Sequence, residues 1–391
     1  MGPLEGKTVL DLSRYGPGRY CSMILADFGA EVITVETPRF ASELPSLVTD
    51  DVGARYLGQN RNKKSIALNL KNEEGKKIFY RLAEKADVIL ETFRPGVVKR
   101  LGVDYETVKK YNPRVVYCSI SGYGQDGPYS QRPGHDLNYV GLAGVLHMIG
   151  QKEGPPTYLP VQMADLAGGT SQATIAILAA LIAQDKTGKG QYIDVSMTDG
   201  VVFYQWTLAM MYLIDGIQLE RAELPTGSDH AWMNIYKAKD GKYFTVATLE
   251  PWLWANLCRL VGRQDFADTQ FGPPERQREM YSGLSEVFAT KDRDEWVKLL
   301  NEANVCVAPV CTFAETFSDP QIVHRKLVVE IDHPKRGKVK VLNTPYKLSE
   351  TPAQVRTRPP LYAEHTAEIL GSMLGLSDKE LERLRKKQVI E

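Results

Sequence analysis

The sequence predicts an α/β protein built on a parallel sheet, because strand-like and helix-like segments alternate from its first residues. Thr8–Leu12 and Glu31–Glu36 are rich in β-branched and apolar residues, and both are expected to form strands. Between them, Tyr20–Phe28 carries apolar residues at helical spacing, and Gly29 is suited to end that helix. A strand–helix–strand unit of this kind joins two parallel strands.

The same alternation continues along the first half of the chain. Further strands are expected at Ser65–Leu68, Val88–Glu91, Val115–Ser119 and Tyr192–Ser196, and helices at Glu73–Lys85 and Ala164–Gln184. The second half differs, because Trp232–Lys237 and Tyr243–Ala247 flank Asp240–Gly241 and predict a β-hairpin. Helices are expected after it at Trp252–Val261, Arg276–Ala289, Arg293–Ala303 and Glu364–Leu374. A second, smaller α+β domain is therefore expected, in keeping with a length of 391 residues.

Composition removes several classes of function. Lys plus Arg and Asp plus Glu both number 48, and this balance disfavours a nucleic-acid-binding protein. The five cysteines are scattered without a CxxC pair, and no HExxH motif occurs, which argues against a disulfide framework and a metal site. No signal-peptide pattern is visible, the apolar stretch Ala173–Ala183 is too short to span a bilayer, and Gln388–Glu391 is no peroxisomal signal. A cytoplasmic protein without membrane association is expected.

A glycine turn and two cationic loops suggest a phosphate-bearing ligand. Gly16–Pro17–Gly18 partly matches a dinucleotide fingerprint, but Cys21 replaces the third glycine, so a turn that brings backbone close to some ligand is the better interpretation. The run Arg61–Lys64 and the segment Phe93–Gly96, with Arg100 just beyond, place cations in loops beside predicted strands. Arginine suits phosphate oxygens, whereas a solvated surface cluster is the alternative.

Two acidic motifs carry the candidate chemistry. In Gly134–Tyr139, His135 stands beside Asp136, which can orient the imidazole and make it more basic, although a local hydrogen bond is the alternative. Asp165 stands at the start of a strongly predicted helix, where an ordinary helix cap is the alternative. Gly168–Gly169 disfavours a helix and would let a ligand approach N–H groups that stabilise an oxygen as it gains charge.

Taken together, segments over nearly the whole chain resemble the family III CoA-transferase (CaiB/BaiF) superfamily, most closely its α-methylacyl-CoA racemase branch. The resemblance rests on LDLSRYGPGRYCSMILADFGAEVITVE, NRNKKSIALNLK, ADVILETFRPGV, NPRVVYCSISGYGQDGP, GHDLNYVGLAGVLHMIG, ADLAGG and TGKGQYIDVSMTDG. It implies a Rossmann-like large domain with a parallel sheet, a smaller α+β domain and an interlinked homodimer. The large CoA-binding domain would begin with residues 1–205, a linker would follow at 206–226, and the small domain would occupy 227–328. Residues 329–391 would supply a return linker and the C-terminal part of the large domain.

The resemblance also implies roles for individual residues. His135 and Asp165 would act as acid and base on opposite faces of the substrate's α-carbon, with Asp136 assisting. Glu250, in the segment LEP, would orient the histidine. Coenzyme A would be held by six residues, namely Arg39, Lys63, Phe93, Arg94, Arg100 and Tyr139. The partner is then an acyl-CoA thioester, and since CoA is part of the substrate, no separate cofactor is expected.

The reaction itself has alternatives within this superfamily. The expected activity is racemisation of a 2-methylacyl-CoA, because two bases on opposite faces allow inversion. The alternative is CoA transfer between carboxylic acids, with Asp165 attacking the thioester to form a covalent intermediate. A non-catalytic CoA-binding subunit is a third possibility, which the presence of Asp165 argues against. The segment Gly227–Met233 departs from the GGAPFY segment that racemases tend to have at this place.

Overall fold

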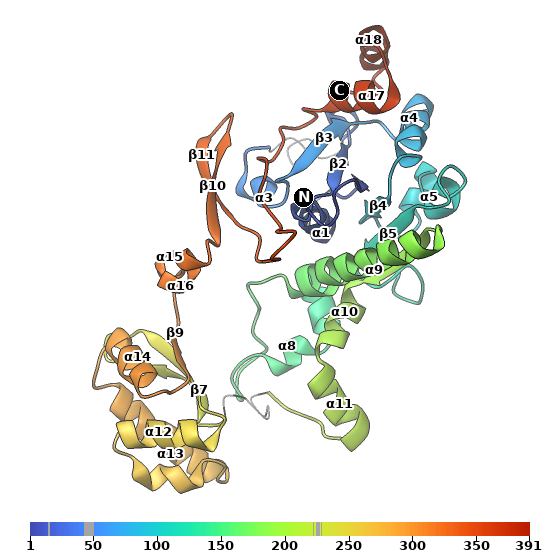
Figure 1. Cartoon of the computed structure of the whole chain (residues 1–391). Helices are drawn as coiled ribbons and strands as arrows, with labels where there is room; N and C mark the ends of the chain where they lie inside the picture. The colour runs from blue at the N-terminus through green and yellow to red at the C-terminus, as the bar shows by residue number, and fades with distance from the viewer. Residues whose placement is uncertain (15, 43–50, 222, 224–226, 228) are drawn as a thin grey trace. The chain divides into compact units, whose positions relative to one another are not determined.

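A computed structural model describes residues 1–14, 16–42, 51–221, 223, 227 and 229–391. The chain divides into two compact units, each assembled from segments that are separated in the sequence (Figure 1). The first unit comprises Met1–Ala143, Leu159–Trp206 and Val323–Glu391. The second comprises Gly144–Tyr158 and Thr207–Ile322.

Six parallel strands form the sheet of the first unit, which confirms the predicted α/β fold class. They are β1 (Thr8–Asp11), β2 (Glu31–Glu36), β3 (Lys63–Ala67), β4 (Val88–Glu91), β5 (Val116–Ser121) and β6 (Gln191–Ser196). Their order is β3-β2-β1-β4-β5-β6, and each neighbouring pair is parallel. This is the Rossmann order, in which the succession of strands reverses between β1 and β4. Ligands of such sheets bind beyond the carboxyl ends of the strands at that reversal.

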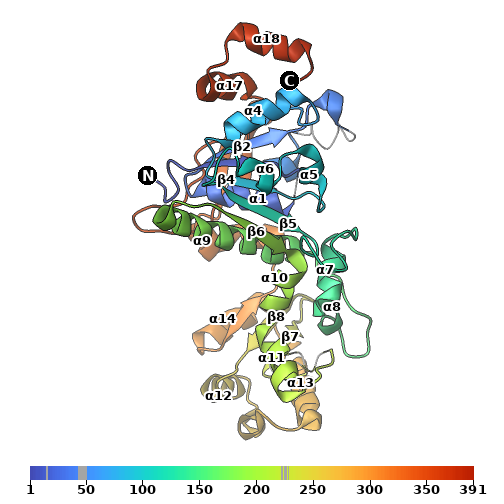
Figure 2. The same ribbon diagram turned by 90° about the vertical axis from the view of Figure 1, so that its right-hand side faces the viewer.

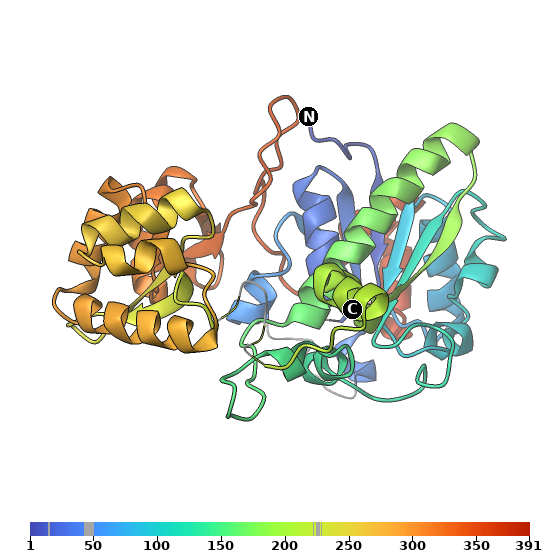
Figure 3. The same cartoon turned by 90° about the horizontal axis from the view of Figure 1, so that it is seen from below.

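Helices cover both faces of this sheet. They are α1 (Pro17–Asp27), η1 (Arg39–Ala41), α3 (Ala54–Leu57), α4 (Glu73–Ala83), α5 (Val97–Leu101), α6 (Tyr105–Val108), α7 (Asp136–Leu142), η2 (Ala164–Ser171), α9 (Gln172–Thr187), α10 (Met197–Tyr204), α17 (Thr366–Leu374) and α18 (Asp378–Lys386). α1 and α9 contact each other on one face (Figure 3). α4 and α17 contact each other on the opposite face, with α18 beside α17 (Figure 2).

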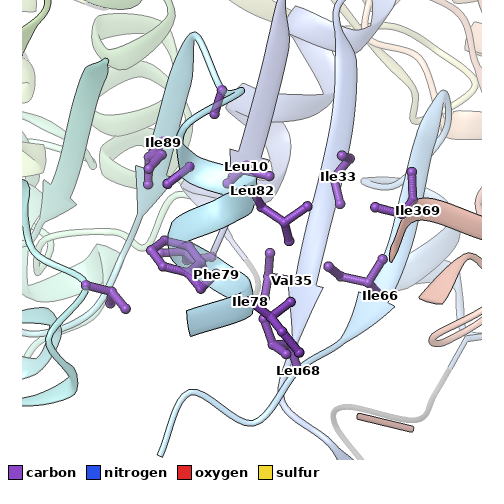
Figure 4. Close-up of a cluster of buried hydrophobic side chains, with 14 of the residues drawn as sticks. Leu10, Ile33, Val35, Ile66, Leu68, Ile78, Phe79, Leu82, Ile89 and Ile369 are labelled. Atoms are coloured by element: carbon purple, nitrogen blue, oxygen red, sulfur yellow. The ribbon is translucent and has the colours of Figure 1, made fainter. Parts of the chain in front are cut away.

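The main core of the first unit lies between α4 and the sheet (Figure 4). α4 begins where the Asn72 side chain accepts a hydrogen bond from the Glu74 amide at 2.8 Å. Its apolar residues Ile78, Phe79 and Leu82 share one face and are buried against the strands. The sheet side chains that they meet include Leu10, Ile33 and Ile89, which stand in register on three adjacent strands.

The C-terminal part of the chain returns to this sheet. β10 (Val328–His333) and β11 (Gly337–Leu342) form an antiparallel hairpin, and α17 and α18 follow. The Thr366 hydroxyl accepts a hydrogen bond from the Ala67 amide at 3.1 Å, and Leu68 forms a β-bridge with Ile390. Ile369 of α17 also joins the core beside β3 (Figure 4). The first unit is therefore completed only by residues from the end of the sequence.

The second unit is an α+β structure around a small antiparallel sheet. β7 (Met233–Lys237) and β8 (Tyr243–Ala247) form the predicted hairpin, and β9 (Val307–Pro309) pairs with β8. Its helices are α8 (Val145–Met148), most of α11 (Trp206–Asp215), α12 (Pro251–Leu260), η3 (Gln264–Thr269), α13 (Pro274–Phe288), α14 (Arg293–Glu302), α15 (Phe313–Ser318) and part of α16 (Pro320–His324). Its core is rich in aromatic residues, among them Tyr236, Phe244, Trp254 and Phe288.

Two expectations about helices are corrected. The helix predicted at Ala164–Gln184 begins with the π-helical segment η2 and continues to Thr187, so it is 24 residues long and could span a membrane by length and composition. In the structure it packs on β5, β6 and α1, which accounts for part of its apolar surface. The helix α11 occupies the first part of the predicted linker 206–226, of which residues 222 and 224–226 lie outside the described residues.

Candidate active site

The loops that follow β1 and β4 meet at the reversal of strand order. The Arg14 guanidinium lies 5.9 Å from the centre of the Phe93 ring. A Cβ atom added at Gly18 would come within 2.6 Å of the Ser13 and Thr92 side chains, so only glycine allows this approach. A cavity opens here at the carboxyl ends of β1 to β4, and its lining includes Ser13, Arg14, Glu36, Leu68 and Phe93.

Asp165 lies in the first turn of η2, next to the Gly16–Pro17–Gly18 turn. A Cβ atom at Gly16 would lie 3.8 Å from Asp165 Oδ2, and the φ of Gly16 is +70°. The Thr170 hydroxyl donates to the carbonyl oxygen of Pro17 at 2.8 Å, which ties the turn to the same helix. The side-chain amide of Gln162 donates a hydrogen bond from Nε2 to Asp165 Oδ2 at 3.0 Å. The glycine turn therefore brings backbone close to a carboxylate, and Gln162 is a neighbour that sequence reasoning missed.

Asp136 holds the start of the helix that carries Asp165. Its Oδ1 atom accepts hydrogen bonds from the backbone amides of Ala164, at 2.6 Å, and Asp165, at 3.0 Å. Burial raises the pKa of Asp165 to about 6, and the negative charge of Asp136 adds to this rise, whereas the nearby His135 opposes it. A carboxyl group in this state can accept or release a proton near neutral pH.

His135 immediately precedes α7 and is exposed. Its backbone is fixed, because its amide donates to Asn138 Oδ1 at 3.0 Å and its carbonyl accepts from the Asn138 amide at 2.8 Å. The structure therefore brings together three of the four expected catalytic residues: His135, Asp136 and Asp165. The fourth, Glu250, stands at the start of α12 in the second unit, where it makes no capping hydrogen bond.

Tyr139 lies behind the histidine motif. Its ring is buried and meets the Tyr123 ring edge-on at 5.0 Å. A Cβ atom at Gly122 or Gly134 would come within 2.6 Å of the Tyr139 ring, so both glycines make room for it. Burial raises the pKa of Tyr139 to about 12, which keeps the phenol protonated at neutral pH.

The paired glycines of η2 serve packing instead of ligand approach, which corrects the interpretation made from the sequence. A Cβ atom at Gly168 would lie 2.3 Å from the Met197 carbonyl oxygen, and one at Gly169 would lie 3.0 Å from the Pro17 side chain. A Cβ atom added at Gly200 of α10 would likewise lie 2.4 Å from the Gly168 carbonyl oxygen, so these two glycines let the helices approach closely. The amides of Ala164 and Asp165 are already bonded to Asp136, so these two N–H groups are not free to stabilise a substrate oxygen.

The two predicted cationic loops differ in whether their charged groups are exposed. Arg94 and Arg100 are exposed, and within the described part of the chain neither guanidinium has an ion pair or hydrogen bond. Arg94 is close enough to Tyr139 to act on its pKa. These two arginines, with the Phe93 ring, are therefore available to an anionic ligand at the carboxyl edge of the sheet.

The run Arg61–Lys64 is instead part of the structural framework. Arg61 forms a buried bidentate pair with Asp27, at 3.0 and 2.6 Å. Lys63, expected to bind CoA, has a fully buried side chain whose ammonium donates to the Arg19 carbonyl at 2.7 Å and lies 3.4 Å from Asp11. The ammonium of Lys63 is thus unable to meet a phosphate from solvent in this structure.

Arg39, also expected to bind CoA, lies in η1 beside the C-terminal residues. Its Nε atom is 3.6 Å from Glu391 Oε1, and its guanidinium lies 4.5 Å from the centre of the Tyr362 ring. About half of its side chain remains exposed.

No group of three His, Cys, Asp or Glu residues with metal-binding geometry occurs among the residues that the structure describes.

Comparisons with known proteins fit this arrangement. The sequence pattern of CoA-transferase family III matches residues 4–366. Human succinyl-CoA:glutarate CoA-transferase is 35% identical, over 100% of this chain and 90% of that protein. Human α-methylacyl-CoA racemase is 33% identical, over 99% of this chain and 97% of that protein. A solved CaiB/BaiF family protein from Brucella suis superposes with a TM-score of 0.83 at 30% identity, over 95% and 99% of the two chains.

Proposed function

The chain belongs to CoA-transferase family III, and on that basis we propose that it exchanges the α-proton of a 2-methylacyl-CoA and thereby racemises it. The observation that carries this proposal is the placing of His135 beside an Asp165 whose pKa is raised to about 6. A carboxyl group with this pKa is mostly ionised at neutral pH and could also act as a nucleophile, so the neighbouring His135 is what favours proton exchange. A group that must both take and return a proton works best with a pKa near the working pH.

The proposed reaction uses the two residues in opposite roles. For one enantiomer, His135 removes the α-proton and the Asp165 carboxyl delivers a proton to the other face. For the opposite enantiomer, the Asp165 carboxylate is the base and the His135 imidazolium is the acid. Asp136 orients the Asp165 helix throughout, and Glu250 is proposed to orient His135, as in the resemblance.

The exposed arginines are proposed to bind the nucleotide part of CoA. Arg94 and Arg100 are the sequence neighbours of Phe93 and Leu101, which line the cavity, and unpaired guanidinium groups form strong hydrogen bonds with phosphate oxygens. Arg39 is proposed as a further contact through its exposed half. Such contacts hold substrate and transition state alike, so they set affinity more than turnover.

CoA transfer is the second candidate, favoured by the 35% identity to human succinyl-CoA:glutarate CoA-transferase. In that reaction Asp165 attacks the thioester carbonyl, CoA leaves as the thiolate, and the acyl group stays on the carboxylate as an anhydride. The CoA thiolate then attacks the Asp165 carbonyl, which releases the donor acid and leaves CoA as a thioester on Asp165. The acceptor carboxylate displaces CoA from this thioester to form a second anhydride, and the thiolate attacks the acceptor carbonyl, which forms the product thioester and frees Asp165.

One experiment separates the two reactions. The protein is incubated with a 2-methylacyl-CoA in deuterated water, without any acceptor acid, and deuterium at the α-carbon is measured by mass spectrometry. Racemisation incorporates one deuterium at the α-carbon. CoA transfer does not break the bond between the α-carbon and its hydrogen, so it incorporates no deuterium there. Unlabelled substrate, together with CoA transfer to an added acid, would contradict the racemase proposal.

A homodimer is proposed as the working form. In the first unit, Phe203 and Trp206 are each 70% exposed, and in the second unit Leu213 and Ile214 of α11 are 71% and 69% exposed. Large apolar side chains that are exposed in this way usually mark a protein interface. The stoichiometry follows from sedimentation or light scattering, and a monomer at micromolar concentration would contradict it.

A further inference from the structure

Glu91 is a buried carboxyl group that the proposed chemistry leaves without a role. It ends β4, directly before the loop that carries Phe93 and Arg94, and it is 1% exposed. Among the described residues, the charged side chain that acts on its pKa is Asp194, whose charge has the same sign. A buried carboxyl group without a cation lowers stability, so its presence at this place indicates a function.

The neighbours of Glu91 come from the strands on both sides and from the helix after its loop. Ser119 of β5 stands opposite Glu91, its hydroxyl group hydrogen-bonds the carboxyl group, and Asp194 of β6 follows in the same row. From β1 and α5, the apolar residues Leu12 and Val98 join the core on this side of the sheet. The other titratable neighbours, whose pKa values are raised by burial and further by the charge of Glu91, are Tyr117, Cys118 and Tyr192.

One oxygen atom of Glu91 holds the backbone of the loop that follows β4. The Phe93 amide donates to Glu91 Oε2 at 2.7 Å, which is short for an N–H···O hydrogen bond. Burial raises the pKa of Glu91 to about 7, whereas the hydrogen bonds from Ser119 and the Phe93 amide oppose this rise because they favour the ionised form. The carboxyl group therefore has a bound donor on the loop and another on the sheet.

The bond to Phe93 fixes a loop that has little other freedom. A Cβ atom at Gly18 would lie 2.6 Å from the Thr92 side chain, so the loop is packed tightly against the turn after β1. The Arg94 carbonyl accepts from the Val97 amide at 3.1 Å, where α5 begins. Because the Phe93 ring lines the cavity and Arg94 follows it directly, a change in the Phe93 backbone moves both side chains.

We propose that Glu91 is a positioning residue for the acyl-CoA thioester: its carboxyl group holds the Phe93 amide and thereby fixes Phe93 and Arg94 in the arrangement that binds the nucleotide end. This inference rests on the proposed function, because it needs a CoA thioester beside Phe93. Glu91 itself makes no contact with the substrate in this proposal, so it acts on affinity and leaves the proton transfer at Asp165 unaffected.

The first test follows the backbone amide signal of Phe93 in the full-length protein labelled with nitrogen-15 phenylalanine. The signal is assigned by its loss in Phe93→Leu. In the natural protein it should move upfield as the pH falls through about 7, because protonation of Glu91 weakens a charge-assisted hydrogen bond. Glu91→Gln keeps an acceptor oxygen and should remove this pH dependence, whereas Glu91→Leu should place the signal upfield at every pH.

The second test measures the dissociation constant of CoA by calorimetry, at a pH where Glu91 is ionised. Glu91→Leu should weaken binding about tenfold, the cost of one lost hydrogen bond to a charged group, and should raise KM for the thioester with kcat nearly unchanged. Glu91→Gln should restore most of the affinity, because it keeps the acceptor for the Phe93 amide. Ser119→Ala, at the same depth on the same face, leaves the Phe93 bond in place and is the matched control that should change neither value.

A stability measurement shows whether the variants are folded. Leucine suits the apolar surroundings of Glu91 and removes a buried charge, so the urea midpoint of Glu91→Leu should equal or exceed that of the natural protein. Where Glu91→Leu is unstable, the Phe93 titration in Glu91→Gln, which keeps the shape of the side chain, still tests the bond.

Two results would overturn the inference. A Phe93 signal that responds neither to pH nor to the Glu91 variants would show that the carboxyl group does not hold the loop. Unchanged CoA affinity in Glu91→Leu, with the Phe93 bond lost, would show that binding does not depend on it. A natural protein that binds no CoA, but whose Phe93 signal still follows Glu91, would reject the proposed function and leave the anchored loop intact.

Discussion

Asp136 Oδ1 lies 3.0 Å from the backbone nitrogen of Asp165 and accepts its hydrogen bond. The same oxygen accepts from the Ala164 amide at 2.6 Å, so Asp136 fixes the first turn of the helix that carries the second acid. Its negative charge also raises the pKa of Asp165, with burial as the larger cause. One side chain thus influences both the position and the protonation of another.

Asp136→Asn should separate these two effects, because asparagine keeps an acceptor oxygen and removes the charge. The rate limb that reports Asp165, expected near pH 6 in the natural protein, should move to lower pH while burial keeps it above the ordinary aspartate value. The measurement is kcat/KM against pH for each enantiomer. Asp136→Ala also removes the cap and should cost about 1 kcal/mol of stability. An unmoved limb in Asp136→Asn would show that its charge does not act on Asp165.

The pH dependence of the natural protein should have opposite signs for the two enantiomers. When Asp165 is the base, its carboxylate form is required, so kcat/KM falls as the pH drops below about 6. When Asp165 is the acid, its protonated form is required, so kcat/KM falls as the pH rises above about 6.

Asp165→Asn, which has nearly the same shape, should reduce both rates by at least about a hundredfold. Near-normal turnover of Asp165→Asn would remove this residue from the site.

His135→Ala distinguishes the two reactions of the family. Racemisation should fall by about a hundredfold or more, because one face of the α-carbon loses its base. CoA transfer through Asp165 should be affected much less, and hydroxylamine should then convert the activated Asp165 carboxyl group to a hydroxamate during turnover. We expect the loss of racemisation and no trapped adduct, as measured by mass spectrometry of the active-site peptide.

Arg94→Ala and Arg100→Ala should each raise KM for the thioester more than they lower kcat. Both guanidinium groups are exposed and unpaired in the described structure, so their removal leaves the fold unchanged. Arg385→Ala on α18, an equally exposed change, is the matched control and should leave KM unchanged. A loss confined to kcat would show that Arg94 and Arg100 act on the transition state.

Two adjacent lysines should differ sharply in their contribution to stability. Lys63→Met leaves Asp11 without its buried ammonium partner and should cost roughly 3–5 kcal/mol of unfolding free energy. Lys64→Met removes only partly exposed pairs with Glu31 and Glu368 and should cost about 1 kcal/mol or less. Urea denaturation of both variants gives the comparison, and equal costs would contradict the buried role of Lys63.

The sheet could be predicted because its strands are short apolar runs ended by loop residues, as at Val88–Glu91, where the predicted and observed bounds agree. The grouping of Arg94 with Phe93 could also be predicted, since both follow a strand directly. The buried position of Lys63 could not be predicted, because a cationic run beside a strand has the same appearance whether it faces solvent or a buried acid. Its partner Asp11 lies on β1, two strands across the sheet, and only tertiary structure brings the two together.

The contact between Asp136 and Asp165 could not be predicted from the sequence for a similar reason. Asp136 looked like a partner of His135, its neighbour in the chain, whereas in the structure its carboxylate bonds to Ala164 and Asp165. Gly168 looked like an opening for a ligand, yet α10 fills that space with Gly200. In both cases a contact between distant segments changes what a local pattern indicates.

The return of α17 and α18 to the first sheet has a consequence for how the chain folds as it is synthesised. Ala67 bonds to Thr366 and Leu68 pairs with Ile390, so β3 keeps an uncovered apolar edge until nearly the entire polypeptide has left the ribosome. The second unit, mostly drawn from one stretch of sequence, has no such delay and can form first. A nascent chain arrested before α17 should therefore bind chaperones through the first unit while the second unit already resists protease.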